Sequence, residues 1–159
     1  MKPHIKDFLE FLEDRENKPI PLKAKLLNPD DYKINPEDLK VKGSLVLSTT
    51  PIKQLPDGLK VKGDLFLDRT EITQLPDNFK VGKSLYLSRT PIKQLPDNLQ
   101  VGGNLSVSYT FITQLPNNLQ VGGNLSLRRT PISKTMSKEQ IRKEILDKGG
   151  YVKGDIFLT

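Results

Sequence analysis

A segment that begins with Leu-Pro recurs every 20 residues along the middle of the chain. It occupies 55–59, 75–79, 95–99 and 115–119, each time with Asp or Asn after the proline. Self-similarity at a fixed period of about 20 to 50 residues is typical of a solenoid, in which each repeat is one coil. A single coil cannot bury its own apolar side chains, so neighbouring coils must cover them. The period therefore predicts a stack of coils.

Each repeat places apolar residues at the same four positions. The four columns are Val41, Val61, Val81, Val101, Val121; Leu45, Leu65, Leu85, Leu105, Leu125; Leu47, Leu67, Leu87, Val107, Leu127; and Ile52, Ile72, Ile92, Ile112, Ile132. The alternation of the two Leu columns has a period of two, which predicts one short half-buried strand per coil. We expect six such strands in one parallel sheet, near 44–48, 64–68, 84–88, 104–108, 124–128 and 155–158.

Polar residues also recur in columns. The Thr column is Thr50, Thr70, Thr90, Thr110 and Thr130, and the Gln column is Gln54, Gln74, Gln94 and Gln114. We expect each Thr hydroxyl to bond to backbone groups of the adjacent coil, because buried polar groups are hydrogen-bonded. We expect the Gln side chains to form a ladder between coils. The Pro-Asp pair followed by Gly or Asn predicts a turn whose later residue has positive φ.

The run Leu65-x-Leu67-x-x-Thr70-x-Ile72 resembles the strand motif of leucine-rich repeats. The 20-residue length and the Leu-Pro pairs are similar to the short repeats of secreted bacterial leucine-rich effectors and of related phage-encoded proteins. The resemblance covers 34–134 and 151–159, and it implies a β-rich (α+β) solenoid of six coils that binds proteins. Val and Gly stand before the strand where that family usually has a Leu. A right-handed β-helix therefore remains an alternative.

The ends of the array depart from the repeat. We predict one repeat domain over 1–159, with an N-terminal helix and connector cap at 1–33, five repeats at 34–134, a helical insertion at 135–150 and a final half-repeat at 151–159. Ile5, Phe8, Leu9 and Leu12 form one apolar stripe, which predicts a capping helix. Residues 18–29 show no clear period and are expected to be a connector. In the insertion, Ser137 and Gln140 fit a capping box, and the expected buried face is Ile141, Ile145 and Leu146.

Composition argues against several functional classes. The chain has no Cys and a single His, so no thiolate nucleophile, disulfide or Cys-based zinc site is expected. No catalytic constellation is evident, and we expect a non-enzyme without cofactor or metal. No long apolar run or signal-peptide core is present, which favours the cytoplasm of a bacterium or of an infected host cell over a membrane.

The columns between the buried Leu positions are the candidate binding surface, because side chains alternate along a strand. The candidate partner-binding residues are Phe66, Arg69, Tyr86, Arg89, Tyr109, Arg128 and Arg129. Aromatic residues and Arg are enriched at the hot spots of protein interfaces. The main prediction is therefore a protein partner of the strand face. The alternative is nucleic-acid binding, since 41–135 carries 12 basic and 6 acidic residues. The chain is expected to be a monomer or an edge-paired homodimer.

Overall fold

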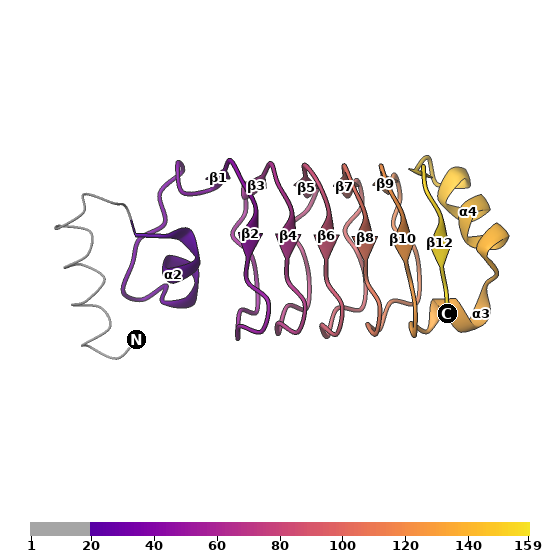
Figure 1. Cartoon of the computed structure of the whole chain (residues 1–159), viewed down its shortest axis with the longest axis horizontal. Helices are drawn as coiled ribbons and strands as arrows, with labels where there is room; N and C mark the ends of the chain where they lie inside the picture. The colour runs from indigo at the N-terminus through magenta and orange to yellow at the C-terminus, as the bar shows by residue number, and fades with distance from the viewer. Residues whose placement is uncertain (1–19) are drawn as a thin grey trace.

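The computed structural model describes residues 20–159 as a β-solenoid whose coils of about 20 residues are stacked along the long axis (Figure 1). The capping helix expected from Ile5 to Leu12 lies outside this range. Two parallel six-stranded sheets run along the stack. Sheet A contains β1 (Lys40–Val41), β3 (Lys60–Val61), β5 (Lys80–Val81), β7 (Gln100–Val101), β9 (Gln120–Val121) and β11 (Tyr151–Val152). Sheet B contains β2 (Leu45–Val46), β4 (Leu65–Phe66), β6 (Leu85–Tyr86), β8 (Leu105–Ser106), β10 (Leu125–Ser126) and β12 (Ile156–Phe157).

The prediction of a single parallel sheet is wrong. Sheet B is the expected sheet, and sheet A is a second one. Each strand of sheet A is two residues long, and only its Val points inward. Such a strand has too few positions for an alternating pattern. Its pairing comes from the identical register of successive coils, as in the parallel pairs Lys40 with Lys60 and Val41 with Val61.

The core consists of the predicted apolar columns. Leu65, Leu85 and Leu125 are fully buried, as is Ile92. The Leu of each Leu-Pro pair is also buried, so the extended return between the two sheets closes the third side of the core. The four columns are continuous from coil to coil because the strands are paired without a register shift.

The Thr column is buried but serves its own coil. The Thr70 hydroxyl donates to the Leu67 carbonyl at 2.8 Å, and the Thr90 hydroxyl donates to the Leu87 carbonyl at 2.8 Å. The expected bond to the adjacent coil is therefore not the one that forms. The hydroxyl instead stabilises the turn at the end of each sheet B strand, where a carbonyl three residues earlier lies within reach.

Other polar columns connect the coils, and two of them form ladders over three or more coils. A side-chain oxygen in the column just before sheet B accepts the backbone N–H of the same column in the next coil. The Ser84 N–H donates to the Asp64 carboxylate at 2.9 Å, and the Asn104 N–H donates to the Ser84 hydroxyl at 3.0 Å. The members are Ser44, Asp64, Ser84, Asn104, Asn124 and Asp155. This column is therefore a ladder between coils.

The second ladder is formed by asparagines. The Asn98 amide donates to Asn78 at 2.8 Å, and the Asn118 amide donates to Asn98 at 2.8 Å. The predicted Gln ladder is absent from the described part of the chain, where the four Gln side chains are exposed and make no hydrogen bond. Asn is the shorter amide and lies in a turn, so its side chain is held at the same place in each coil.

A short helix lies at the N-terminal end of the stack, where the sequence predicted only a connector. It is α2 (Leu22–Leu27), whose partly buried Leu22, Leu26 and Leu27 pack against the core (Figure 1). The Lys25 ammonium lies 2.9 Å from the Asp38 carboxylate. The hydrogen bond from Lys25 lowers the pKa of Asp38, with a further contribution from the Asn35 backbone N–H. This ion pair joins α2 to the first coil.

Two helices close the C-terminal end. They are α3 (Ile132–Thr135), a single turn that the sequence did not predict, and α4 (Lys138–Asp147). The capping box of α4 is confirmed, since the Ser137 hydroxyl accepts from the Gln140 N–H and the Gln140 side chain accepts from the Ser137 N–H. Ile141 and Ile145 are buried as expected. Leu146 is 58% exposed, so its assignment to the buried face was wrong.

Arg142 connects α4 to the last coil. Its guanidinium donates to the Val152 carbonyl at 2.7 Å and to the Gly154 carbonyl at 2.8 Å. In the preceding coil, the equivalent carbonyls of Val121 and Gly123 accept from the N–H groups of Lys153 and Gly154. The side chain of Arg142 thus provides the two donors that a further coil would provide, and sheet A ends without unpaired acceptors at these positions.

Candidate binding surface

Two aromatic rings lie side by side on the outer face of sheet B. Phe66 follows Leu65 in β4, and Tyr86 follows Leu85 in β6, so both rings point away from the core. Their centroids are 4.9 Å apart and their planes are 7° apart, which is a stacked pair. Each ring is half-buried because it covers the other. The pair presents one apolar surface near the middle of the stack.

The neighbouring coils have serines in the same column. The hydroxyls of Ser88 and Ser106 are 2.9 Å apart, and those of Ser108 and Ser126 are 2.8 Å apart. These pairs connect the column of the rings to the next column along the strand. The outer face of sheet B is therefore apolar at β4 and β6 and polar at β8 and β10.

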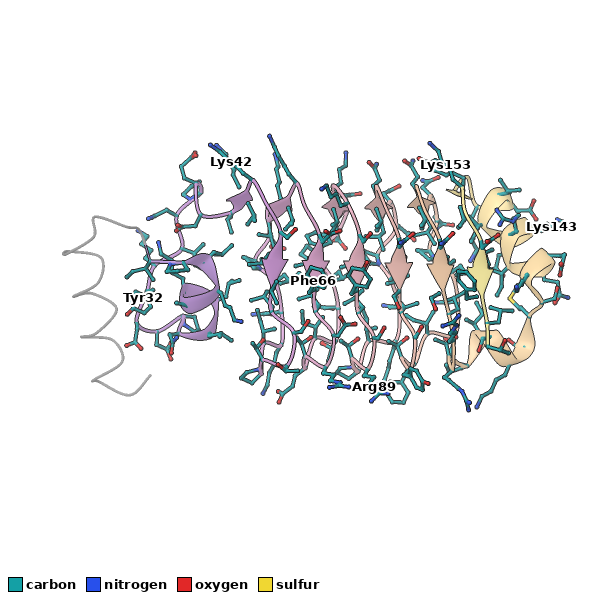
Figure 2. The ribbon with its side chains drawn as sticks, viewed as in Figure 1. Tyr32, Lys42, Phe66, Arg89, Lys143 and Lys153 are labelled. Carbon is teal, nitrogen blue, oxygen red and sulfur yellow. The ribbon has the colours of Figure 1, made fainter. Side chains whose placement is uncertain are left out.

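The turn after each sheet B strand carries large side chains in an unusual backbone conformation. The residues with positive φ in this turn are Thr49, Arg69, Arg89, Tyr109 and Arg129, with φ between 57° and 61°. All five are exposed, and we call this row the arginine corner. Arg89 lies along one long edge of the solenoid, opposite the edge where Lys42 and Lys153 lie (Figure 2).

Aromatic side chains lie among the arginines. The Arg89 guanidinium lies 5.0 Å from the centroid of the Tyr109 ring, within the range of a cation–π contact. Tyr109 is 50% exposed and Phe111, two residues further on, is 58% exposed. Since the residue between them, Thr110, is buried, both rings point to solvent. Phe111 was not among the candidate residues. The signal in the sequence was that an aromatic residue stands in a column that otherwise contains Pro and Glu.

Most of the candidate residues lie in one group that ends at Arg129 in the arginine corner, and Arg128 lies apart from it. Phe66 and Tyr86 are in contact, and Arg69 and Arg89 follow them in the same two coils. Arg128, by contrast, lies over the Phe157 ring at 5.1 Å, near the C-terminal end of the stack. The sequence did not predict this second cation–π contact, because an insertion separates Phe157 from the regular repeats.

The arginines of this surface form no ion pair with an acidic residue within 20–159. Among residues 20–159, the ion pairs involve Lys25, Lys40, Lys53, Lys143 and Lys148, and none involves Arg69, Arg89, Arg128 or Arg129. Asp68 is next to Arg69, but one of its oxygens accepts the Ser88 N–H at 2.8 Å. The guanidinium groups are therefore available to an external acceptor.

A groove over sheet A was not predicted, because sheet A itself was not predicted. It has a volume of about 700 Å³, and Lys60, Lys62 and Lys80 are among the residues that line it. Its floor includes Gly102, where a Cβ would lie 2.1 Å from the Gly82 carbonyl oxygen. The column of Lys and Gln residues before each Val was the signal in the sequence that could have indicated this face.

Among residues 20–159, no three His, Cys, Asp or Glu side chains lie close enough together to hold a metal ion. None of the helices in the same range has the length and apolar character needed to cross a membrane.

Comparison with known proteins does not assign this chain to a family. No protein-family model matches it, and no curated protein is similar to it.

Proposed function

We propose that this protein is a non-enzymatic binding module that recognises a protein partner through the outer face of sheet B and the adjoining arginine corner. The observation that carries the proposal is the stacked pair of Phe66 and Tyr86, which are half-buried. Each ring is followed three residues later by an arginine, Arg69 or Arg89. Rigid aromatic rings next to Arg are enriched at the energetic centres of protein interfaces. A stacked pair is already ordered, so little side-chain entropy would be lost on binding.

The use of polar residues elsewhere supports this choice of surface. The ladders of Ser, Asp and Asn connect the coils, and their hydrogen bonds are made within the chain. The Gln column is exposed but uniform, with no aromatic residue in it. In the outer face of sheet B and the arginine corner, by contrast, aromatic rings and arginines lie in neighbouring columns.

We propose a partner that is a different protein and not a second copy of this chain. Arg142 bonds to the carbonyls where another coil would pair with sheet A, and α4 packs against β11 and β12. This arrangement disfavours a second copy stacked on that end. The resemblance of the repeats to those of bacterial leucine-rich effectors and phage-encoded proteins extends the proposal to a bacterial or phage factor that binds and modulates a host protein.

The second candidate is nucleic-acid binding, which the lysine-lined groove over sheet A favours. Lysines can neutralise phosphates, and such binding weakens steeply as salt increases. Only one aromatic residue among those lining the groove, Tyr151, is exposed enough to stack on a base, since Phe79 is buried. Binding of single-stranded nucleic acid usually combines charge with several stacking rings. Protein binding is therefore the better supported function.

The test is a double substitution, Phe66→Ser with Tyr86→Ser, measured against a partner identified by affinity purification and then purified. Ser occupies the same column at Ser106 and Ser126, so the fold should tolerate it. We expect the dissociation constant to rise about 30-fold, which corresponds to about 2 kcal/mol lost from a hot spot.

The matched control is Gln74→Ser with Gln94→Ser, on the exposed return. It should leave the dissociation constant unchanged. Loss of binding in this control, with normal binding by the Phe66 and Tyr86 variant, would show that the partner binds the opposite face.

A further inference from the structure

Each regular coil contains two turns whose third residue has positive φ. The first turn follows the Leu-Pro pair, and its positive-φ residues are Gly58, Asn78, Asn98 and Asn118. The second turn follows the strand of sheet B and carries the residues of the arginine corner. In one coil both turns are closed by a bond from the N–H of the fourth residue to the carbonyl of the first, from Leu59 to Pro56 at 3.4 Å and from Thr70 to Leu67 at 3.3 Å.

The two turns therefore share a positive φ at the third residue but have different residues there. A turn with positive φ at its third residue favours Gly or Asn, because a Cβ crowds the carbonyl in the left-handed region. The first turn follows this rule in every coil. The second turn has Thr, Arg, Arg, Tyr and Arg, none of which is a preferred residue. Unfavourable backbone conformations that persist in a fold tend to mark functional positions.

The fold does not need these side chains. The N–H groups of Arg69 and Arg89 donate to the Ser88 and Ser108 carbonyls, both at 3.0 Å, and Asn or Gly would donate in the same way. The guanidinium groups have no acidic partner among the described residues. Arg69, Arg89 and Arg129 are exposed, and Arg89 also lies over the Tyr109 ring.

We infer that the arginine corner is a site for an acidic segment of the protein partner, with Arg69, Arg89 and Arg129 binding its carboxylates. The guanidinium group matches a carboxylate with two parallel hydrogen bonds. Arg69 and Arg89 stand one coil apart, and Arg129 stands two coils beyond Arg89. A hollow of about 310 Å³ between Ser48, Asp68, Arg69 and Arg89 lies beside them. This inference rests on the proposed function and specifies the chemistry of the partner.

The neighbouring residues favour a protein over a nucleic acid. Asp68 and Glu71 lie on either side of Arg69 in the sequence, and Tyr109 interrupts the row of arginines. The continuous positive track that a row of phosphates would need is therefore missing, whereas a short acidic segment needs only a few separate arginines. Tyr109 and Phe111 add exposed apolar area next to Arg89, which suits carboxylates that stand beside apolar side chains on a protein surface.

The test uses a fluorescein-labelled oligo-glutamate peptide and fluorescence anisotropy. The variant is Arg69→Asn, Arg89→Asn and Arg129→Asn, which places Asn in the turn where Asn is preferred. We expect the affinity for the peptide to fall at least about tenfold, because charge-assisted contacts are lost. We also expect the melting temperature to stay the same or to rise, because Asn adopts positive φ more readily than Arg.

The control variant removes the same number of positive charges from the other sheet. Lys60→Asn, Lys62→Asn and Lys80→Asn change residues that are exposed and unpaired among the described residues. This variant should bind the peptide within a factor of about two, as expected for charges away from the contact. Equal loss in both variants, or no measurable binding by the unaltered protein, would overturn the inference.

Two further outcomes would also contradict it. A lower melting temperature of the arginine variant would show that the side chains are structural. Tighter binding of an oligo-dT strand than of oligo-glutamate would assign the corner to nucleic acid. The purified partner separates this inference from the proposed function. If the partner binds the arginine variant normally but not the Phe66 and Tyr86 variant, the proposed function stands and the acidic-segment inference fails.

Discussion

In the turns of this solenoid, the backbone conformation limits which residues fit at each position. Asn98 illustrates this, because it has φ of 61° and its side chain both donates to Asn78 and accepts from Asn118. The same residue therefore satisfies the backbone conformation and the connection between coils. Arg89, with φ of 60°, satisfies neither requirement in this way. This difference separates a residue retained for the fold from one available for binding.

Asn98→Ala tests the structural role of the asparagine ladder. Ala would be strained at positive φ and would remove two side-chain hydrogen bonds, so we expect a loss of about 1–3 kcal/mol in the free energy of unfolding by urea. Asn98→Gly removes the same hydrogen bonds, but Gly adopts positive φ without strain, so the loss in unfolding free energy should be smaller. If Ala and Gly cost the same, the conformation of the turn is not what selects Asn.

At the scale of elements, the strands are very short and depend on one another. A strand of two residues, such as β4, has no stability of its own, and it is held by its pairing with β2 and β6 and by the core beneath it. The end of the stack is the place where such pairing must be replaced. The guanidinium group of Arg142 replaces it for sheet A by donating to two carbonyls of the last coil.

Arg142→Met tests this replacement. Methionine can fill much of the same space but cannot donate, so the carbonyls of Val152 and Gly154 would lose their partner. We expect a loss of about 1–3 kcal/mol in unfolding free energy. Lys143→Met is the control, because Lys143 is exposed and pairs only with Asp147, and it should change stability by less than about 0.5 kcal/mol. Similar losses for the two variants would show that α4 is held by its apolar contacts alone.

The elements also show what the sequence could and could not predict. The buried columns and the strands of sheet B follow from the repeat, and the capping box predicted the start of α4. Sheet A could not be predicted from alternation, because each of its strands has one inward residue. The conformation of Arg69 and Arg89 was also missed, since Ser-Arg and Asp-Arg pairs are not turn signals. The stacking of Phe66 on Tyr86 follows from adjacent coils in register.

At the scale of the whole molecule, the two sheets give the solenoid two different long surfaces. Along sheet A, lysines line an open groove, whereas sheet B and the arginine corner combine aromatic rings with arginines. The hydrophobic core and the ladders are common to all coils and determine the shape. The stacked rings of Phe66 and Tyr86 and the contact of Arg89 with Tyr109 belong to the second surface. The proposed recognition of a partner therefore uses that surface.

The most direct test is to map the partner on the protein by NMR, using isotope-labelled protein and the unlabelled purified partner. If the partner binds the outer face of sheet B and the arginine corner, backbone chemical shifts should change most at 66–69, 86–89 and 109–111. Signals from Lys60, Lys80 and Gln100 in sheet A should change little. Changes concentrated on sheet A, with none near Phe66 and Tyr86, would contradict the account.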